Sequence, residues 1–424
     1  MRLFRSYPWL CTVVIVTVSC CISVLTASPH AAIADSRPIT MNGKPFFLIG
    51  LYDYPTASAT SSGWPTTDIM QHLPELSRAG FNSVLISICK VDPKLMDNAL
   101  QKYGIATMVD VGGYFNQSDL EYSFRSKKSL INGSPLDLKI RSLAHNPGLL
   151  GYYTVDEAMG PYKTVDPLIC QARLNLTAAK VWLHEPQRDP NHPVFYCEEC
   201  YLGKANDTAY RDWCSIGNVF GEDIYPYFWN VALSDVGKAT KHRERTLKDP
   251  SAPVFMVIEG CNCWDFDHGS KARPNFAENQ FMAYDCVING AKGIMWWGTT
   301  YLDLSKPEDA ENWEEIKEIA GQLHQMPFLA DASPAQNFTL SAPDLEGLLK
   351  KSGHYDYLIV ANKSSKTLMN ARIEVPGWKS VSTLFEKRSL TCHDGSFADN
   401  FQPWGVHIYT NKYNDNPPAP PAGS

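Results

Sequence analysis

Two apolar, strand-like runs of the chain each lead into a glutamate. The segment Gly151–Val155 continues to Glu157, and the segment Pro253–Ile258 ends at Glu259. If a fold brings two carboxyl groups to one pocket, one can protonate a leaving oxygen while the other attacks the sugar or activates a water molecule. The pair therefore predicts cleavage of a glycosidic bond.

Short apolar runs alternate with helix-like segments in the first three quarters of the chain. Helices are expected at Thr67–Ala79, Pro93–Tyr103 and Asn275–Asn289, each followed by a glycine that can end a helix. Strands that alternate with helices pair in parallel, and eight such units predict an α/β protein with a (β/α)8 TIM barrel. The eight expected strands are Phe46–Tyr52, Ser83–Ile88, Ala106–Val111, Leu149–Val155, Val194–Cys197, Ile216–Ile224, Val254–Ile258 and Gly293–Trp297.

An open, doubly wound sheet that binds a nucleotide is the alternative fold. It needs a glycine-rich turn after the first strand, whereas this turn reads Leu51-Tyr-Asp-Tyr-Pro55 and no phosphate-binding loop occurs elsewhere. The sequence therefore favours the barrel and predicts no nucleotide cofactor. Long loops are expected at Gly112–Lys139 and Tyr225–Arg243.

The pattern changes near the end of the chain. After Gln325, short alternating segments follow one another without helix signals, which predicts a small antiparallel β-sandwich at residues 329–413, after a barrel at 35–328. A proline-rich tail at 414–424 is expected to be disordered. The expected sandwich strands include Asn337–Ser341, Tyr355–Asn362, Ala371–Val375, Val381–Phe385 and Val406–Tyr409.

The N-terminus has the features of a secretory signal peptide. Arg2 and Arg5 precede the apolar stretch Trp9–Leu25, and small residues follow as far as Ala34. We expect cleavage of residues 1–34 and a secreted protein with no membrane segment after cleavage. Cleavage after Ala27 and an uncleaved signal anchor are the alternatives.

Export has consequences for modification and for the cysteines. Nine cysteines follow the predicted cleavage site, so disulfides are expected, with at least one thiol left over. The pairs Cys197/Cys200 and Cys261/Cys263 lack the further ligands that a zinc site requires, so we expect no metal. Sequons for N-glycosylation occur at Asn116, Asn132, Asn175, Asn206, Asn337 and Asn362.

The net charge of −7 over 424 residues gives no basic field for nucleic acid, which is therefore not an expected partner. Aromatic residues make up 12% of the chain, which suits a sugar-binding cleft but also a large core. Carbohydrate is the expected partner.

A barrel of this kind carries its active site at the carboxyl ends of the strands. Counting strands places Glu157 after the fourth and Glu259 at the seventh. Since neighbouring residues of a strand point to opposite faces, one of Trp296 and Trp297 should face the barrel mouth, and we expect Trp297. Other residues at these ends are Tyr52, Asp110, Glu222, Asp223 and Tyr225.

Four segments together resemble clan A glycoside hydrolases, in particular β-galactosidase-like members. They are Met41–Gly50, the fourth-strand Tyr152-Tyr-Thr-Val-Asp-Glu157, Asp223-Ile-Tyr-Pro226 and Gly290–Trp297. The likeness extends over residues 40–325, and a C-terminal sandwich is common in that superfamily.

The resemblance implies a role for individual residues. Glu157 matches the acid/base and Glu259 the nucleophile, while Trp297 matches the aromatic residue beneath the sugar. Tyr225 lies near the place of an aromatic residue that can hydrogen-bond to the nucleophile. Asp156 departs from the family, which usually has an asparagine that contacts the sugar 2-hydroxyl.

Two hypotheses follow. The first is a secreted, retaining glycosidase of oligo- or polysaccharides, with its two carboxyl groups roughly 5–5.5 Å apart. The second is a carbohydrate-binding barrel that has lost turnover, which would show glutamates that point apart or are plugged. A serine hydrolase is disfavoured because no G-x-S-x-G motif occurs.

Overall fold

The computed structural model describes residues 36–55, 69–111, 132–156, 180, 183–199, 217–247, 249–261, 273–331 and 337–412, without the side chains of residues 155, 156, 199 and 244–246. The predicted signal peptide and the predicted proline-rich tail lie outside these ranges. In the described ranges, no helix is long and apolar enough to cross a membrane.

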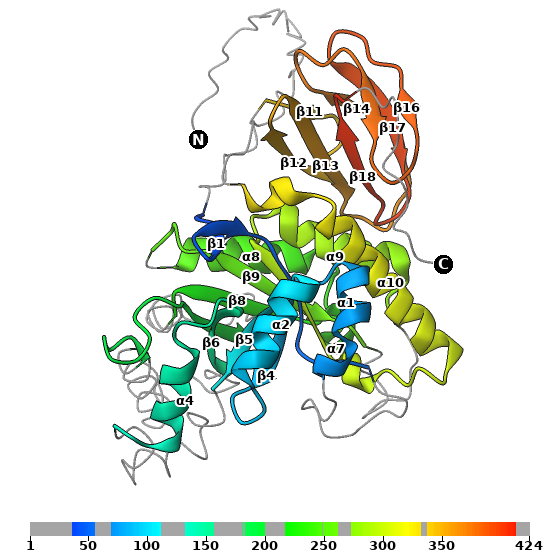
Figure 1. Ribbon diagram of the computed structural model, residues 1–424. Helices are drawn as coiled ribbons and strands as arrows, with labels where there is room; N and C mark the ends of the chain where they lie inside the picture. The colour runs from blue at the N-terminus through cyan, green and yellow to red at the C-terminus, as the bar shows by residue number, and fades with distance from the viewer. Residues whose placement is uncertain are drawn as a thin grey trace, which may run out of the picture. The chain divides into compact units, whose positions relative to one another are not determined.

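Eight parallel strands close into a barrel, as predicted (Figure 1). Their order around the barrel is β10-β3-β4-β5-β6-β7-β8-β9, so each strand pairs with its neighbour in the chain and the last pairs with the first. The strands are β3 (Leu48–Leu51), β4 (Ser83–Ser87), β5 (Ala106–Asp110), β6 (Leu149–Asp156), β7 (Val194–Glu199), β8 (Val219–Ile224), β9 (Val254–Glu259) and β10 (Gly293–Trp297).

Side chains alternate between two apolar layers. In β9, Phe255 and Val257 belong to the cluster inside the barrel, whereas Met256 and Ile258 belong to the cluster between the sheet and the helices. Because both faces of each strand are buried, the strands read as nearly continuous apolar runs. The same alternation turns Glu259, the last residue of β9, toward the interior.

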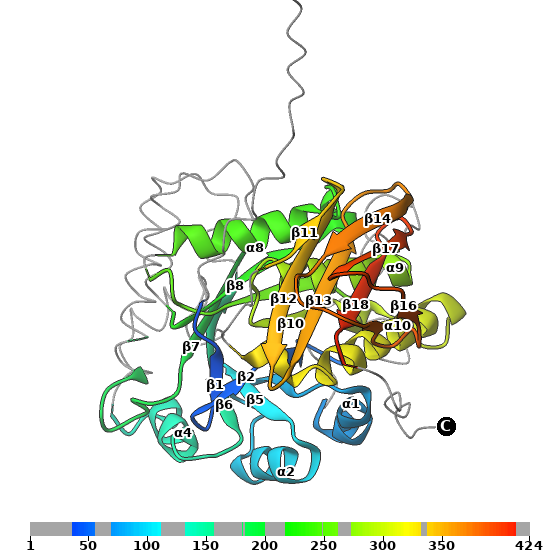
Figure 2. The same cartoon turned by 90° about the horizontal axis from the view of Figure 1, so that it is seen from above.

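Helices lie outside the barrel strands (Figure 2). As predicted, α2 spans Pro93–Tyr103; the Asp92 side chain caps its start, and Gly104 ends it with φ 69°. The first predicted helix starts later than expected, because η1 (Ile69–His72) precedes α1 and a proline fits an α-helix only in its first turn. The other helices are α1 (Leu73–Ala79), α4 (Pro135–Leu143), α7 (Pro226–Trp229), α8 (Asp235–Thr246), α9 (Phe276–Ile288) and α10 (Pro307–His324).

Three of these helices correct the expected loops. Both α7 and most of α8 fall in Tyr225–Arg243, and α4 begins within Gly112–Lys139. The sequence of α8 is rich in charged residues and contains Gly237, which suggested a loop. A Cβ atom at Gly237 would lie 2.2 Å from Asp285 of α9, so glycine allows the two helices to approach closely.

The C-terminal part is all-β and antiparallel, as predicted. A three-stranded sheet (β11-β14-β17) and a five-stranded sheet (β12-β13-β18-β15-β16) enclose an apolar core of their own. The strands β12, β16 and β17 were not among those named from the sequence. The strands are β11 (Thr339–Leu340), β12 (Leu345–Ser352), β13 (Tyr355–Asn362), β14 (Leu368–Glu374), β15 (Val381–Thr383), β16 (Ser389–Leu390), β17 (Ser396–Phe401) and β18 (Val406–Thr410).

The five-stranded sheet packs against the barrel helices. Ile359 of β13 and Ile408 of β18 join the apolar cluster that surrounds the barrel strands. Lys350 of β12 donates a hydrogen bond to the carbonyl of Leu329, 3.1 Å away. A small hairpin, β1 (Ile39–Met41) and β2 (Lys44–Phe46), precedes the first barrel strand.

Candidate functional site

Glu259 lies at the carboxyl end of β9, on the inner face, with no exposed surface. Its Oε1 accepts a hydrogen bond from the backbone N–H of Tyr227 at 2.8 Å, and its Oε2 accepts one from Phe228 at 3.3 Å. Both donors belong to α7, a single helical turn that begins with Pro226 directly after β8. The first N–H groups of a helix have no partner within the helix, so this carboxylate satisfies two of them.

Burial dominates the electrostatics of this carboxyl group. It raises the pKa of Glu259 to about 7, against the two backbone hydrogen bonds, which lower it. Among the described residues, no cationic side chain forms an ion pair with Glu259. Near neutral pH the group can therefore exist in either protonation state; nucleophilic attack requires the ionised form and acid catalysis the protonated one.

Two stacked aromatic rings flank Glu259. Trp297 of β10 is the register partner of Glu259, and its ring stacks on Tyr225 with centroids 4.8 Å apart and planes inclined by 25°. Trp297 is partly exposed, whereas Trp296 is fully buried on the opposite face of the strand. Tyr225 covers one face of the Trp297 ring, and Tyr301 meets the same ring edge to face with centroids 5.7 Å apart.

Two tyrosines meet at the barrel mouth. Tyr52 follows β3, which pairs with β10 on the side away from β9, and Tyr153 belongs to β6. The hydroxyl groups of Tyr52 and Tyr153 are 2.6 Å apart, and their rings meet edge to face at 5.7 Å. Tyr153 was not among the predicted residues. Strand alternation could have found it, because Tyr152 points outward and hydrogen-bonds to Asp189 at 2.7 Å.

The predicted acids divide between the two faces of the sheet. Asp223 is buried and, by alternation with Tyr225, faces the interior. Asp110 is partly exposed at the end of β5 and pairs in register with Tyr153. The expectation that Glu222 lies in the mouth is wrong. Glu222 faces the helices, where Arg243 of α8 donates a hydrogen bond to it at 2.7 Å.

Glu157, the predicted acid/base, lies outside the described residues. Of Asp156, only the backbone is described; it ends β6 and pairs with Cys197. These two positions stay predictions.

The cysteines and the N-glycosylation sequons are the residues that disulfide formation and glycosylation would modify in an exported protein. Cys261 is disulfide-bonded, whereas Cys197 lies fully buried inside the barrel and Cys200 lies outside the described residues. Within the described ranges, no group of three or more His, Cys, Asp or Glu side chains could hold a metal ion. Asn362 is fully buried and its amide nitrogen donates to the carbonyls of Lys366 and Gln402, so the folded protein does not present this sequon. Three other sequons, Asn116, Asn175 and Asn206, lie outside the described residues.

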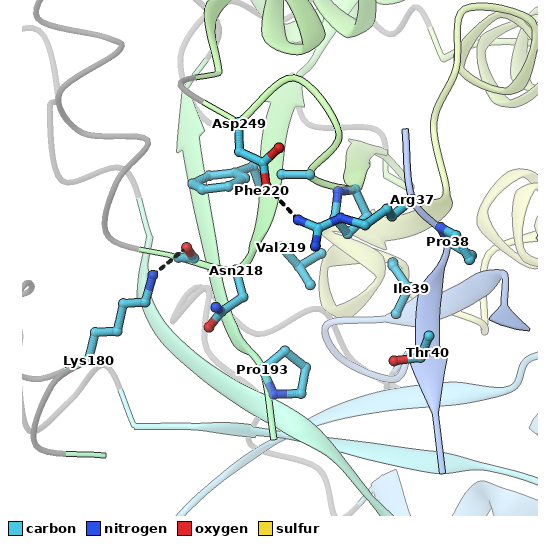
Figure 3. Close-up of a pocket in the computed structure, with 13 residues that line it drawn as sticks. Arg37, Pro38, Ile39, Thr40, Lys180, Pro193, Asn218, Val219, Phe220 and Asp249 are labelled. Carbon is cyan, nitrogen blue, oxygen red and sulfur yellow. Dashed lines mark hydrogen bonds and ion pairs between the residues drawn. The ribbon is translucent and has the colours of Figure 1, made fainter. Parts of the chain in front are cut away.

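A separate cavity lies at the other end of the barrel (Figure 3). It has a volume of about 530 Å³ and opens beside the residues that precede β7, β8 and β9. Its cationic groups are engaged by the protein, since Arg37 pairs with Asp249 at 2.5 Å and Lys180 donates to the carbonyl of Gly217 at 2.8 Å. Barrel enzymes carry their chemistry at the opposite end.

Comparison with solved structures finds this architecture in glycoside hydrolases. A GH42 β-galactosidase from G. stearothermophilus, a catalytic mutant, has a TM-score of 0.58 at 9% identity, over 88% of this chain and 99% of that one. An α-amylase from Geobacillus thermoleovorans, complexed with acarbose, has a TM-score of 0.54 at 11% identity, over 87% and 99%. Amy13B from Eubacterium rectale has a TM-score of 0.52 at 9% identity, over 89% and 98%.

At these identities the likeness shows the fold, a closed (β/α)8 barrel followed by a β domain. No protein-family model matches the sequence, and no curated protein is similar to it.

Proposed function

We propose that the protein is a retaining glycoside hydrolase that cleaves the O-glycosidic bonds of an oligo- or polysaccharide. The observation that carries this proposal is the position of Glu259. It is a titratable carboxyl group on the inner face of the seventh strand of a closed barrel, at the end where barrel enzymes act, and it is held by two amide donors. Glu259 acts as the nucleophile, and Glu157 acts as the acid/base.

The two hydrogen bonds assign different tasks to the two carboxylate oxygens. Oε1 is held at 2.8 Å, whereas the bond from Phe228 to Oε2 is longer, at 3.3 Å. Oε2 is therefore the oxygen that more readily gives up its donor and bonds to the anomeric carbon. As that bond forms, the glycosidic C–O bond breaks and Glu157 transfers its proton to the leaving oxygen. Water, deprotonated by Glu157, then hydrolyses the ester and restores both carboxyl groups.

The remaining mouth residues bind the sugar. The partly exposed Trp297, stacked on Tyr225, offers an aromatic surface for a sugar ring. Tyr52, Asp110 and Asp223 supply hydroxyl and carboxyl groups on the same inner face, and Asp156 accepts from a sugar hydroxyl in place of the asparagine usual in clan A.

The protein acts outside the cell. The N-terminal segment supports this proposal through its signal-peptide pattern. The disulfide at Cys261 supports it as well, because disulfides persist in oxidising compartments.

A second candidate function is a carbohydrate-binding barrel without turnover. The observation that favours it is the complete burial of Glu259, whose two oxygens already accept hydrogen bonds from α7. On this hypothesis the carboxylate is a helix cap, and the aromatic residues alone bind sugar.

Turnover of a panel of aryl glycosides and polysaccharides distinguishes the two candidates. We expect Glu259→Gln to lose about a thousandfold or more in kcat, since the nucleophile is removed. Glu308→Gln, an exposed acid in the first turn of α10, should keep full activity. A 2-deoxy-2-fluoro aryl glycoside should leave a covalent sugar on Glu259, detected by peptide mass spectrometry. Equal rates in wild type and Glu259→Gln would contradict the proposal, and sugar binding without turnover would support the second candidate.

A further inference from the structure

The helical turn that holds Glu259 is joined to the helical shell by a side-chain hydrogen bond. The hydroxyl of Tyr227 donates a hydrogen bond to Oε2 of Glu278 at 2.6 Å. The backbone N–H of the same tyrosine donates to Glu259. Tyr227 therefore contacts two carboxyl groups, one through its backbone and one through its side chain.

Glu278 is itself held firmly. It occupies the third position of α9, where its Oε2 also accepts the N–H of Asn275 at 2.9 Å while its own N–H donates to the Asn275 side chain at 3.2 Å. This reciprocal pair is a capping box. It anchors the carboxylate to the start of a 13-residue helix that packs against the barrel.

The turn between these anchors is short and only partly buried. It contains four residues: Pro226 is buried, Tyr227 and Trp229 pack partly against the apolar core, and Phe228 is 42% exposed. A single helical turn is not stable in isolation. Its position, and with it the position of the two N–H donors, depends on the contacts at its ends.

We propose that Glu278 is a positioning residue for Glu259, which it serves by fixing Tyr227 and hence the two amide donors of α7. The capping box of α9 thus has a second role besides capping the start of the helix. This role rests on the proposed function only for its effect on turnover, because its effect on the ionisation of Glu259 does not require catalysis.

The direction of that effect follows from the contacts. The two backbone hydrogen bonds lower the pKa of Glu259 against burial, so a displaced turn should raise it above about 7. Burial and then the bond to Glu278 raise the pKa of Tyr227, which stays a phenol and a donor. Among the described residues, other titratable groups on neighbouring elements include Asp223, Tyr225 and Tyr301.

The experiment follows the carboxyl carbon of Glu259 by NMR in glutamate-labelled protein, with the resonance identified from its loss in Glu259→Gln. Tyr227→Phe removes only the hydroxyl and leaves the capping box intact, and Glu278→Ala removes the acceptor. Both should raise the pKa of Glu259 by about 0.5 to 1, the equivalent of one lost hydrogen bond. Glu278→Gln keeps an acceptor oxygen and should restore most of the wild-type value. Glu308→Ala should leave it unchanged.

An unchanged pKa in Tyr227→Phe would overturn the proposal, even if Glu278→Ala alters it, because the effect would then come from α9 alone. Where turnover is measurable, Tyr227→Phe should lower kcat about three- to tenfold with little change in KM. If no variant or wild type turns over any substrate, the proposed function fails while the titration still decides the positioning role.

Discussion

Two buried glutamates on neighbouring strands of the barrel are held in opposite ways. Glu222 of β8 and Glu259 of β9 both have no exposed surface. Glu222 faces the helices, where the guanidinium of Arg243 lies 2.7 Å from its Oε2. Glu259 faces the interior at the barrel mouth, where it is held by two backbone N–H groups.

The contrast lies in what compensates the charge. A guanidinium supplies a full opposite charge and fixes Glu222 between the sheet and α8. Two amide dipoles compensate Glu259 only in part, so burial raises its pKa to about 7. The first arrangement joins a helix to the sheet. The second keeps a carboxyl group that can gain or lose a proton near neutral pH, at a cost in stability.

The largest expected effect comes from breaking the ion pair. Arg243→Met leaves the Glu222 carboxylate buried without its cation, and Oε1 of Glu222 already has no hydrogen-bond partner among the described residues. We expect the free energy of unfolding to fall by about 3–5 kcal/mol in urea titrations at pH 7. Arg37→Met removes an exposed pair with Asp249 and should cost less than about 1 kcal/mol. Similar losses in the two variants would contradict the distinction between a buried and an exposed pair.

An intermediate effect of the opposite sign is expected at Glu259. The ordinary pKa of 4.5 rises to about 7 in the folded protein, so folding binds a proton between these pH values. The wild type therefore loses stability as the pH rises from about 4.5 to 7, by up to roughly 3 kcal/mol. Glu259→Gln cannot ionise, but its NH2 group meets one of the two amide donors, so it should gain only about 1–2 kcal/mol over wild type at pH 8.

Urea titrations at pH 5 and pH 8 check this prediction, because the gain must shrink at pH 5, where the wild-type carboxyl group is protonated. The Glu308→Gln control should show no such dependence. A gain of equal size at both pH values would mean that packing, not charge, explains it.

The barrel could be predicted because its strands carry a recognisable pattern of apolar side chains. Strands buried on both faces give continuous apolar runs, and each of the eight predicted runs overlaps a barrel strand. Period-two alternation also predicts that Glu222 points to the face of the sheet opposite to that of Asp223 and Tyr225. Glu222 was therefore misplaced among the mouth acids only because the alternation was not applied to it.

Other features could not be predicted in this way. The partners of Glu259 are backbone amides, which any residue but proline would supply, so no residue type marks them. In β12, Gly347 and the lysines Lys350 and Lys351 hide the strand, and its buried and exposed residues do not alternate. Its partner β13 was predicted with its observed bounds because its apolar residues are consecutive.

The smallest expected effect concerns a third buried acid, Asp285, whose paired side chain is another carboxyl group and not a cation. Asp285 of α9 accepts hydrogen bonds from the N–H of Gly237 at 2.8 Å and from Asn289 at 2.7 Å. Burial and then the charge of Glu346 on β12 raise its pKa well above the ordinary value, which Lys241 only partly offsets.

Glu346→Gln removes the like charge where the β domain meets the barrel and should therefore lower the pKa of Asp285. In the wild type, Asp285 must either stay protonated at pH 8 or be repelled by the charge of Glu346. The variant should therefore gain about 0.5–1 kcal/mol of unfolding free energy at pH 8, an amount reduced by the partial exposure of Glu346. The gain should vanish near pH 4, where the raised pKa keeps Asp285 protonated and the repulsion between like charges is lost. Urea titrations at the two pH values measure it, with Glu308→Gln as the control. A loss of stability at pH 8 would mean that the shared proton between the two acids stabilises the contact more than their charges oppose it.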